Sequence, residues 1–422
     1  MSDVKGCGIL EFTQFPHIDG VELAKKKVLV RVDFNSPIGK DGTIMDDSRI
    51  RAHRTTIKKL MDAGAATVII THQGRPGDDD FVTLEAHADR LREVVGADIK
   101  FINDVIGPAA LKAIKELEGG EALLLDNVRL VSEELIEAEP EKQARAYLVR
   151  RLSPLFTHYV FDAFATAHRS QPSIVGFPVA LPSLVGDVMK QELEALGKSL
   201  SGSETPRLFV LGGAKVRDTI KIVEFLTRKR AADRILTTGL VGLTFHVAKG
   251  GRAGKSLLKF LEEKGLTTLI SMARRVVLSG APVDTPYDVK VVKDDGRVVE
   301  EPINTADGVP VDVGSYTTLM FSEMIKEAAV VVMRGPAGYV EDPRFRAGTF
   351  ELLKAALESN AHVVIGGGHL GSMLNEVGVV RERGVHVSTG GGALLIALSG
   401  ETLPALKALE ISYRKFFTGG SV

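Results

Sequence analysis

Short runs of β-branched and aliphatic residues alternate along the chain with longer stretches in which apolar residues recur every three or four positions. The short runs predict β-strands and the longer stretches predict amphipathic helices. Helices are predicted at 49–63, 83–95 and 108–118. This alternation predicts an α/β fold built on parallel sheets. The predicted strands, in chain order, are 27–33, 67–71, 122–126, 158–162, 207–211, 234–238, 329–333, 362–366 and 385–389.

The alternation is interrupted near residues 180–206. Pro182 and Gly186 precede a helical stretch, 188–200, and the polar turn cluster SGSETP follows it. A chain of 422 residues is also longer than one hydrophobic core usually supports. Residues 283–315 lack a clear period and are expected to form loops and short strands. We therefore expect two doubly wound parallel-sheet domains and a connecting helix, with boundaries at 1–185, 186–202 (the helix) and 203–402.

In the first half, polar or cationic residues follow each predicted strand. Ligands bind outside the carboxyl ends of strands in open parallel sheets, so these residues are expected to share one edge. Arginine forks bind phosphate and carboxylate oxygens in pairs, which predicts a small ligand with several negative charges. Each arginine alone could be a solvated surface residue, and each histidine a structural one, but four strand ends agree. We call this set the anion rim: Asp33, Asn35, Arg49, His72, Arg75, Arg129, His168 and Arg169.

In the second half, glycine turns follow the strands instead. Glycine lets backbone amides approach phosphate closely, and a helix N-terminus adds a favourable dipole. Neither the P-loop pattern nor the G-x-G-x-x-G fingerprint is present, which argues against a P-loop NTPase and a typical NAD enzyme. The turns together predict a nucleotide site and comprise Gly212-Gly213-Ala214-Lys215, Gly239, Gly335-Pro336-Ala337-Gly338, Gly366-Gly367-Gly368 and Gly390-Gly391-Gly392.

Charge and cysteine content narrow the remaining function classes. The net charge is −1, so no general basic excess indicates a nucleic acid or a membrane as partner. A single cysteine, Cys7, excludes an intramolecular disulfide and fits a reducing compartment. The chain has no signal-peptide pattern at its start and no run of about 18 apolar residues. We expect a soluble cytoplasmic kinase whose basic half and glycine-rich half close on two substrates and exclude water.

The motifs at these positions resemble those of phosphoglycerate kinases. The matching segments occur in the family's order over nearly the whole chain, and HQGRPGD and AHRSQPS look closest to archaeal members. The segments are VRVDFNSPI (30–38), DDSRIRA (46–52), THQGRPG (71–77), DNVR (126–129), DAFATAHRSQPS (162–173), LGGAKVRD (211–218), GPAGYVED (335–342) and VSTGGGA (387–393).

The resemblance implies reversible phosphoryl transfer between 1,3-bisphosphoglycerate with ADP and 3-phosphoglycerate with ATP, a reaction of glycolysis and gluconeogenesis that uses Mg²⁺. It implies a monomer whose C-terminal segment, 403–422, returns to the N-terminal domain. The anion rim would hold the phosphoglycerate, and Arg49 would also contact the transferring phosphoryl group. Lys215 would contact the nucleotide phosphates, Glu341 the ribose, and Gly391 and Gly392 the phosphoryl group. The nucleotide site would comprise Gly212, Gly213, Ala214, Lys215, Gly239, Arg334, Gly335, Pro336, Gly338, Glu341, Gly367, Gly368 and His369.

At three positions this chain differs from the pattern that is common in phosphoglycerate kinases. Thr219 replaces a lysine one helical turn after Lys215, Arg334 replaces an asparagine, and His369 replaces an aspartate associated with the metal. No metal ligand is therefore assigned. Because both reacting oxygens belong to acidic groups, no general base is required, and catalysis should rest on positioning and charge. Two alternatives stay open: a kinase for a related phosphorylated acid, and a ligand-binding paralogue without turnover.

Overall fold

The computed structural model describes residues 15–378 and 384–418. Contacts divide the chain into two units. Unit 1 contains the residues up to Glu194 together with those from Thr402 onward, and unit 2 contains Ala195–Glu401. Each unit has a six-stranded parallel sheet with helices, so the predicted α/β class with two parallel-sheet domains is confirmed. None of the helices in the described part of the chain combines the length and apolar character needed to cross a bilayer.

The sheet of unit 1 has the strand order β3-β4-β2-β1-β5-β6. All four strands predicted in this half are present, whereas β3 and β6 were not predicted. The two missed strands are short, and Lys100 interrupts the apolar run of β3. The strands are β1 (Lys27–Arg31), β2 (Ala66–Ile70), β3 (Ile99–Ile102), β4 (Ala122–Leu125), β5 (His158–Phe161) and β6 (Ser183–Val185).

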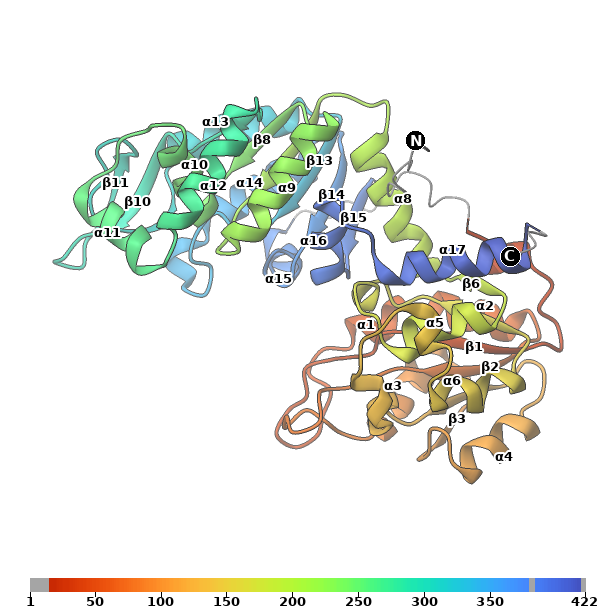
Figure 1. Cartoon of the computed structure of the whole chain (residues 1–422). Helices are drawn as coiled ribbons and strands as arrows, with labels where there is room; N and C mark the ends of the chain where they lie inside the picture. The colour runs from red at the N-terminus through yellow and green to blue at the C-terminus, as the bar shows by residue number, and fades with distance from the viewer. Residues whose placement is uncertain (1–14, 379–383, 419–422) are drawn as a thin grey trace. The chain divides into compact units, whose positions relative to one another are not determined.

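Helices cover the sheet of unit 1 from both sides (Figure 1). One layer contains α1, α2 and α3, which contact one another, and a second contains α5, α6, α7 and α17. In α17 the Ala405 N–H donates to Ala167 O (3.1 Å), so the C-terminal helix packs on unit 1. The helices are α1 (Ser48–Ala52), α2 (Arg54–Asp62), α3 (Glu85–Val95), α4 (Pro108–Glu116), α5 (Pro140–Gln143), α6 (Tyr147–Leu152), α7 (Phe177–Ala180) and α17 (Pro404–Phe416).

The helix predicted over 49–63 is divided into α1 and α2 at His53. The His53 side chain turns into the protein, where it bonds the backbone of Asp33 and the carboxylate of Asp162. These partners lie 20 and 109 residues away in sequence, so local periodicity could not reveal the break.

The sheet of unit 2 has the order β15-β14-β13-β7-β8-β9. The five predicted strands are present, and β9, with two residues, was not predicted. Beyond β9, the stretch 283–315 contributes three short strands to a separate antiparallel sheet, in the order β11-β10-β12. The strands are β7 (Arg207–Leu211), β8 (Arg234–Thr237), β9 (Val283–Asp284), β10 (Asp288–Val292), β11 (Val298–Pro302), β12 (Val309–Val313), β13 (Val330–Arg334), β14 (His362–Gly366) and β15 (Val385–Ser388).

The helices α9, α10 and α12 contact one another and form one layer over this sheet, while α13 and α14 pack together in another (Figure 1). The chain leaves β7 first toward β8 and later toward β13, so β7 and β13 flank the point where the winding direction changes. Ligands bind at such points in doubly wound sheets. The helices are α8 (Asp187–Ser201), which crosses from unit 1 into unit 2, α9 (Val216–Lys229), α10 (Gly239–Ala248), α11 (Lys255–Glu263), α12 (Thr267–Leu278), α13 (Ser315–Lys326), α14 (Ala347–Glu358), α15 (Gly368–Val377) and α16 (Gly392–Leu398).

Candidate active site

The loop after β1 carries Asp33 and Asn35. The Asp33 side chain is buried, and its carboxylate forms an ion pair with Arg49 of α1. The Asn35 N–H donates to Asp33 Oδ1 (3.1 Å), and Asn35 Oδ1 accepts from the Gly74 N–H (2.9 Å). These bonds join the loop after β1 to the loop after β2, so the two loops present their polar groups in a fixed arrangement.

His72, in the loop after β2, is buried among cations. Its Nδ1 lies 3.0 Å from Arg31 Nη2 and 3.8 Å from Asp33 Oδ1. Because a guanidinium can only donate, Nδ1 accepts and the ring proton resides on Nε2. Burial, followed by the charges of Arg31 and Arg129, holds the pKa of His72 well below its usual range. The neutral ring can therefore offer its Nε2–H to a ligand.

Arg129, which follows β4, is buried beneath the loop after β2. Its guanidinium donates to Gly74 O, and Asn127 Oδ1 accepts from the Arg129 N–H (3.2 Å). Asn127 Nδ2 also donates to Gln73 O (2.7 Å). Burial and the nearby Arg169 charge lower the pKa of Arg129 to about 10, so the side chain remains protonated at neutral pH.

His168 and Arg169, in the loop after β5, are partly buried. The atoms His168 Nδ1, Arg169 Nε and Arg129 Nε are buried without a hydrogen-bond partner in the described structure. Buried polar atoms are normally satisfied, so these exceptions indicate groups that await a ligand. Burial and then Arg169 lower the pKa of His168. Arg75 is exposed, and its charge acts on Arg129.

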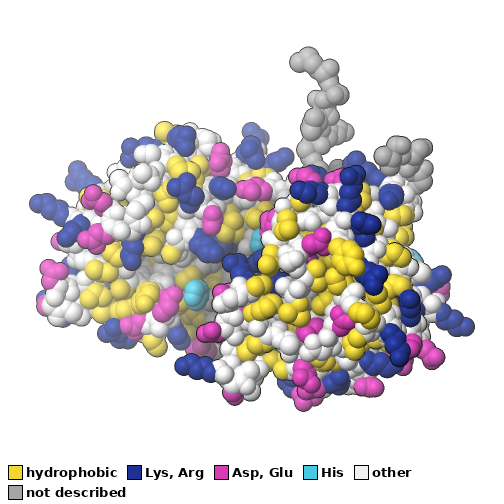
Figure 2. Space-filling view, turned by 60° about the horizontal axis from the view of Figure 1, so that its bottom comes forward, with side chains coloured by type: hydrophobic (Ala, Val, Ile, Leu, Met, Phe, Trp, Pro, Cys, Tyr) yellow, Lys and Arg dark blue, Asp and Glu magenta, His cyan; other side chains and the backbone are white. Residues whose placement is uncertain are grey.

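The structure thus gathers the anion rim at one edge of the unit 1 sheet. The charges acting on His72 come from Arg129, Arg169 and Arg49, which follow three different strands, and from Arg31. The visible face of the molecule carries Lys and Arg interspersed with Asp and Glu (Figure 2). Because the net charge of the protein is only −1, an anion site must be built from positive charges that are gathered locally, as they are at the rim.

Arg31, Ser173 and Glu134 form a buried support beneath the rim that the sequence did not indicate. Arg31 Nε donates to Ser173 Oγ (3.0 Å), and the Arg31 Nη1 group donates to Val32 O (2.7 Å). Glu134 accepts from the Ser173 N–H (3.0 Å) and from its hydroxyl. The available signal was that Arg31, a charged residue, directly follows the apolar run VLV of this strand. Through its bond to His72 Nδ1, Arg31 fixes the position of the His72 ring.

In unit 2 the predicted nucleotide residues line one cavity of about 1090 Å³. Its walls come from the glycine turns and from an apolar group that includes Leu243, Phe260, Val289 and Val311. These apolar residues were missed because two of them lie in the aperiodic stretch 283–315. The predicted residues on the cavity wall are Gly212, Gly213, Ala214, Lys215, Gly239, Arg334, Gly335, Pro336, Gly338, Glu341, Gly367, Gly368, His369, Gly391 and Gly392.

Glycine is needed at this cavity for two different structural reasons. The turns after β7 and β13 pack on each other: the Gly212 N–H donates to Arg334 O and the Gly213 N–H to Pro336 O, both at 2.8 Å. A Cβ at Gly335 would collide with the backbone of Gly212. At Gly367 a Cβ would meet nothing within 4 Å, but φ is +108°. The glycines of the turns after β7 and β13 therefore allow the two turns to pack closely. Gly367 allows a backbone conformation that other residues rarely adopt.

The positions that depart from the family pattern differ in their surroundings. Thr219 is buried, its Oγ1 donates to Lys215 O (3.0 Å), and it is not part of the cavity wall, whereas the exposed Lys215 is. Arg334 lines the cavity and is partly buried, and its Nε has no hydrogen-bond partner in the part of the chain that the structure describes. Burial lowers the pKa of Arg334, and the charge of Asp218 opposes that change.

Acidic residues near the cavity already have partners. His369 Nε2 lies 3.5 Å from Glu341 Oε1 at an exposed position. Asp342 pairs with Arg344 at 2.6 Å. Asp342 thus pairs with Arg344 rather than with Arg334, which lines the nucleotide cavity.

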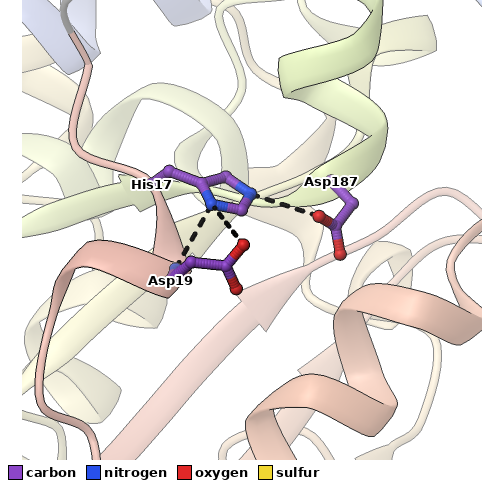
Figure 3. Close-up of side chains that lie close together, drawn as sticks. All are labelled: His17, Asp19 and Asp187. Atoms are coloured by element: carbon purple, nitrogen blue, oxygen red, sulfur yellow. Dashed lines mark hydrogen bonds and ion pairs between the residues drawn. The ribbon is translucent and has the colours of Figure 1, made fainter.

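Among the described residues, one group of three potential metal ligands lies close together: His17, Asp19 and Asp187 (Figure 3). His17 Nδ1 accepts from the Asp19 N–H (3.2 Å), and His17 Nε2 lies 3.3 Å from Asp187 Oδ1. Lys59 Nζ bonds Asp19 Oδ2 (2.9 Å) and Asp187 Oδ1 (2.8 Å). The lysine ammonium supplies the positive charge there, so the group is an ion-pair network at the start of α8.

Comparisons with known proteins agree with this geometry. The family model described as phosphoglycerate kinase matches residues 18–401. Phosphoglycerate kinases of Saccharolobus solfataricus and Sulfurisphaera tokodaii are 53% and 52% identical to the chain over 94% of its length, covering 97% and 96% of those proteins. The crystal structure of phosphoglycerate kinase from Pyrococcus horikoshii OT3 is 39% identical and superposes with a TM-score of 0.85, covering 95% of this chain and all of that one. The resemblance to archaeal members is confirmed, and the chain belongs to the phosphoglycerate kinase family.

Proposed function

We propose that this protein is a phosphoglycerate kinase, a phosphotransferase with a carboxyl group as acceptor. It would transfer a phosphoryl group reversibly between 1,3-bisphosphoglycerate with ADP and 3-phosphoglycerate with ATP, in glycolysis and gluconeogenesis. The observation that carries the proposal is the anion rim, in which the buried atoms Arg129 Nε and Arg169 Nε have no hydrogen-bond partner among the described residues. Oxygens of a phosphorylated acid would satisfy these donors.

Each side of the rim suits one part of 3-phosphoglycerate. Arg129, Arg169 and the exposed Arg75 would bind the phosphate through paired N–H donors, with the neutral His72 as an additional donor. Asp33 is the acceptor in this basic surrounding, and a hydroxyl of the substrate would donate to it. Arg49, held by Asp33, would contact the carboxyl group and the phosphoryl group that is transferred.

The cavity of unit 2 would bind the nucleotide. Its apolar wall, which includes Leu243 and Phe260, would contact the base. Glu341 would accept from the ribose hydroxyls, and Lys215 would contact the phosphates. Gly391 and Gly392 would bring backbone N–H groups to the transferring phosphoryl group. Arg334 would supply a further charge at the phosphates.

Mg²⁺ would enter as part of the nucleotide substrate. Magnesium is commonly bound through substrate phosphates and water with one or two protein carboxylates. His369 stands where the family resemblance has an aspartate, and imidazole is a poor ligand for this hard cation. Asp218, whose charge acts on Arg334, offers the oxygen ligands that this cation prefers. We assign the phosphates as the main ligands.

The reaction needs no proton transfer by the protein. A carboxylate oxygen of 3-phosphoglycerate attacks the γ-phosphorus of ATP, the bond from that phosphorus to the bridging oxygen breaks, and ADP leaves with the electron pair. Arg49 and Lys215 would offset the charge on the transferring group. Since unit 1 binds one substrate and unit 2 the other, we infer that the units close when both are bound.

We infer further that the protein acts as a cytoplasmic monomer, without a nucleic-acid or membrane partner. An assay of acyl phosphate formation from 3-phosphoglycerate and ATP, coupled to reduction of the product, tests the function. Turnover supports the proposal. Binding of both ligands without turnover would identify the non-catalytic alternative, and turnover with another phosphorylated acid alone would identify the kinase alternative.

A further inference from the structure

His53, at the junction of α1 and α2, bonds two partners from opposite sides of its ring. The side chain is buried. Its Nε2 lies 3.1 Å from the backbone nitrogen of Asp33, and its Nδ1 lies 2.9 Å from Asp162 Oδ2. A backbone N–H can only donate, so Nε2 must accept. The ring proton then resides on Nδ1 and is donated to Asp162.

Asp162, at the end of β5, is fully buried and uses both carboxylate oxygens. Oδ2 accepts from His53, and Oδ1 accepts from the Met189 N–H (3.1 Å) in the first turn of α8. The space around this carboxylate is filled, because a Cβ at Gly186 would collide with it. Both oxygens face donors, so this position requires a group that accepts on two sides.

The result is a chain of hydrogen bonds that ends at the anion rim. Its members are Met189 N–H, the Asp162 carboxylate, the His53 ring and the Asp33 N–H. The Asp33 carboxylate in turn holds Arg49, which lies four residues before His53 in the same helical segment. Residue 33 is thereby fixed at its backbone by His53 and at its side chain by Arg49.

We propose that His53 and Asp162 are positioning residues that fix Asp33 and Arg49 for phosphoglycerate. Neither contacts the ligand. The proposal rests on the proposed function and adds a requirement that the family comparison does not supply: a single ring tautomer at His53. A carboxylate that orients a histidine tautomer has large effects in hydrolytic enzymes, where replacement by an amide reverses the tautomer.

The Asp162→Asn variant tests the tautomer directly. If the asparagine oxygen accepts from Met189, its NH₂ group faces His53 Nδ1 and moves the ring proton to Nε2, where it opposes the Asp33 N–H. We expect the KM for 3-phosphoglycerate to rise at least tenfold, with the KM for ATP within twofold of the native value. Long-range ¹H–¹⁵N spectra should show the Nδ1–H tautomer of His53 in the native enzyme and its loss in the variant.

The His53→Phe variant covers the case in which the asparagine rotates and leaves the ring unchanged. Phenylalanine keeps the ring volume but cannot accept from the Asp33 N–H, so the KM for 3-phosphoglycerate should again rise at least tenfold. In the double variant, Asp162→Asn should raise the KM for 3-phosphoglycerate by less than a further twofold. The chain of hydrogen bonds from Asp162 to Asp33 is already interrupted by His53→Phe.

A matched control separates positioning from lost stability. Ser412→Ala removes a buried side chain that accepts from the Ser183 N–H (2.9 Å) and donates to Leu181 O (3.0 Å), in unit 1 but outside the rim. It should lower Tm and leave both KM values unchanged. The proposal is overturned if the His53→Phe variant changes the KM for 3-phosphoglycerate no more than this control, or if native His53 carries its proton on Nε2. A native enzyme without turnover would instead contradict the proposed function, while leaving the tautomer result interpretable.

Discussion

The Arg49 guanidinium donates to the Asp33 carboxylate, although the two side chains come from a helix and from a strand-end loop. The Asp33 side chain is buried, while that of Arg49 is 37% exposed. The Asp33 carboxylate thus holds the guanidinium on one side, while the Arg49 side chain keeps exposed surface. This arrangement preorganises a positive charge at the place where we propose that the phosphoryl group passes.

Arg49→Ala should reduce kcat far more than it weakens phosphoglycerate binding. We expect a loss of at least about 100-fold in kcat, roughly 2.7 kcal/mol of transition-state stabilisation, because the charge is needed mainly during transfer. Steady-state kinetics with 3-phosphoglycerate and ATP measure this. An Arg49→Ala enzyme with nearly native kcat would contradict the assignment.

The other arginines of the rim should behave differently. Arg75→Ala and Arg169→Ala remove groups that we assign to the phosphate of the substrate, which is bound in the ground state and in the transition state alike. Their main effect should therefore be an increased KM for 3-phosphoglycerate. A kcat loss as large as that of Arg49→Ala, with an unchanged KM, would reverse these roles.

Glu341→Ala should raise the KM for ATP and leave the KM for 3-phosphoglycerate unchanged, because we assign this carboxylate to the ribose. The neighbouring Asp342 provides the control, since it is engaged by Arg344. Asp342→Asn should leave both constants near their native values. If Glu341→Ala raises both constants equally, the ribose assignment fails.

The glycine and arginine motifs could be predicted from sequence because each follows a strand, and parallel strands bring their carboxyl ends to one edge. The buried residues that hold these motifs in place could not be predicted. Arg31 and His53 act through buried partners that are distant in sequence, Glu134 and Asp162 among them. The apolar cavity wall was missed for another reason: Val289 of β10 and Val311 of β12 lie in the stretch 283–315, whose apolar residues have no clear period.

Closure should require both substrates. Small-angle X-ray scattering should show a smaller radius of gyration with 3-phosphoglycerate and a nonreacting ATP analogue together than with either ligand alone. The reason is that we propose one substrate site in each unit, so neither ligand alone completes the site. A radius that does not respond to the ligand pair would argue against closure as part of the cycle.

Acidification should destabilise the fold partly through His87. Burial lowers the pKa of His87 to about 4, below the ordinary value of 6.5. Between these values the unfolded chain binds a proton that the folded chain does not, so stability falls as the pH falls. Above pH 6.5 both states are neutral and His87 contributes no pH dependence. The full effect is about 3 kcal/mol, reached near pH 4.

His87→Gln should therefore flatten the decline in the free energy of unfolding below pH 6.5. Urea titrations at intervals from pH 8 to pH 5 measure it. The difference between variant and native protein should be constant above pH 7 and should shift in the variant's favour toward pH 5. A difference that stays constant over the whole range would show that the pKa of His87 is the same in the folded and the unfolded chain.

Arg334→Asn tests whether Arg334 supplies charge to the nucleotide phosphates. Arg334 is partly buried on the cavity wall, its Nε has no hydrogen-bond partner among the described residues, and Asp342 is engaged by Arg344. We expect at least a tenfold loss in kcat, about 1.4 kcal/mol, because a neutral side chain cannot offset the phosphate charge. Arg334→Lys should recover part of the loss.

Thr219→Lys, in contrast, should not recover the lost kcat. Residue 219 is buried and its hydroxyl bonds the helix backbone, so a lysine there costs stability before it can reach the cavity. Full recovery by Thr219→Lys, or a harmless Arg334→Asn, would place the required charge elsewhere.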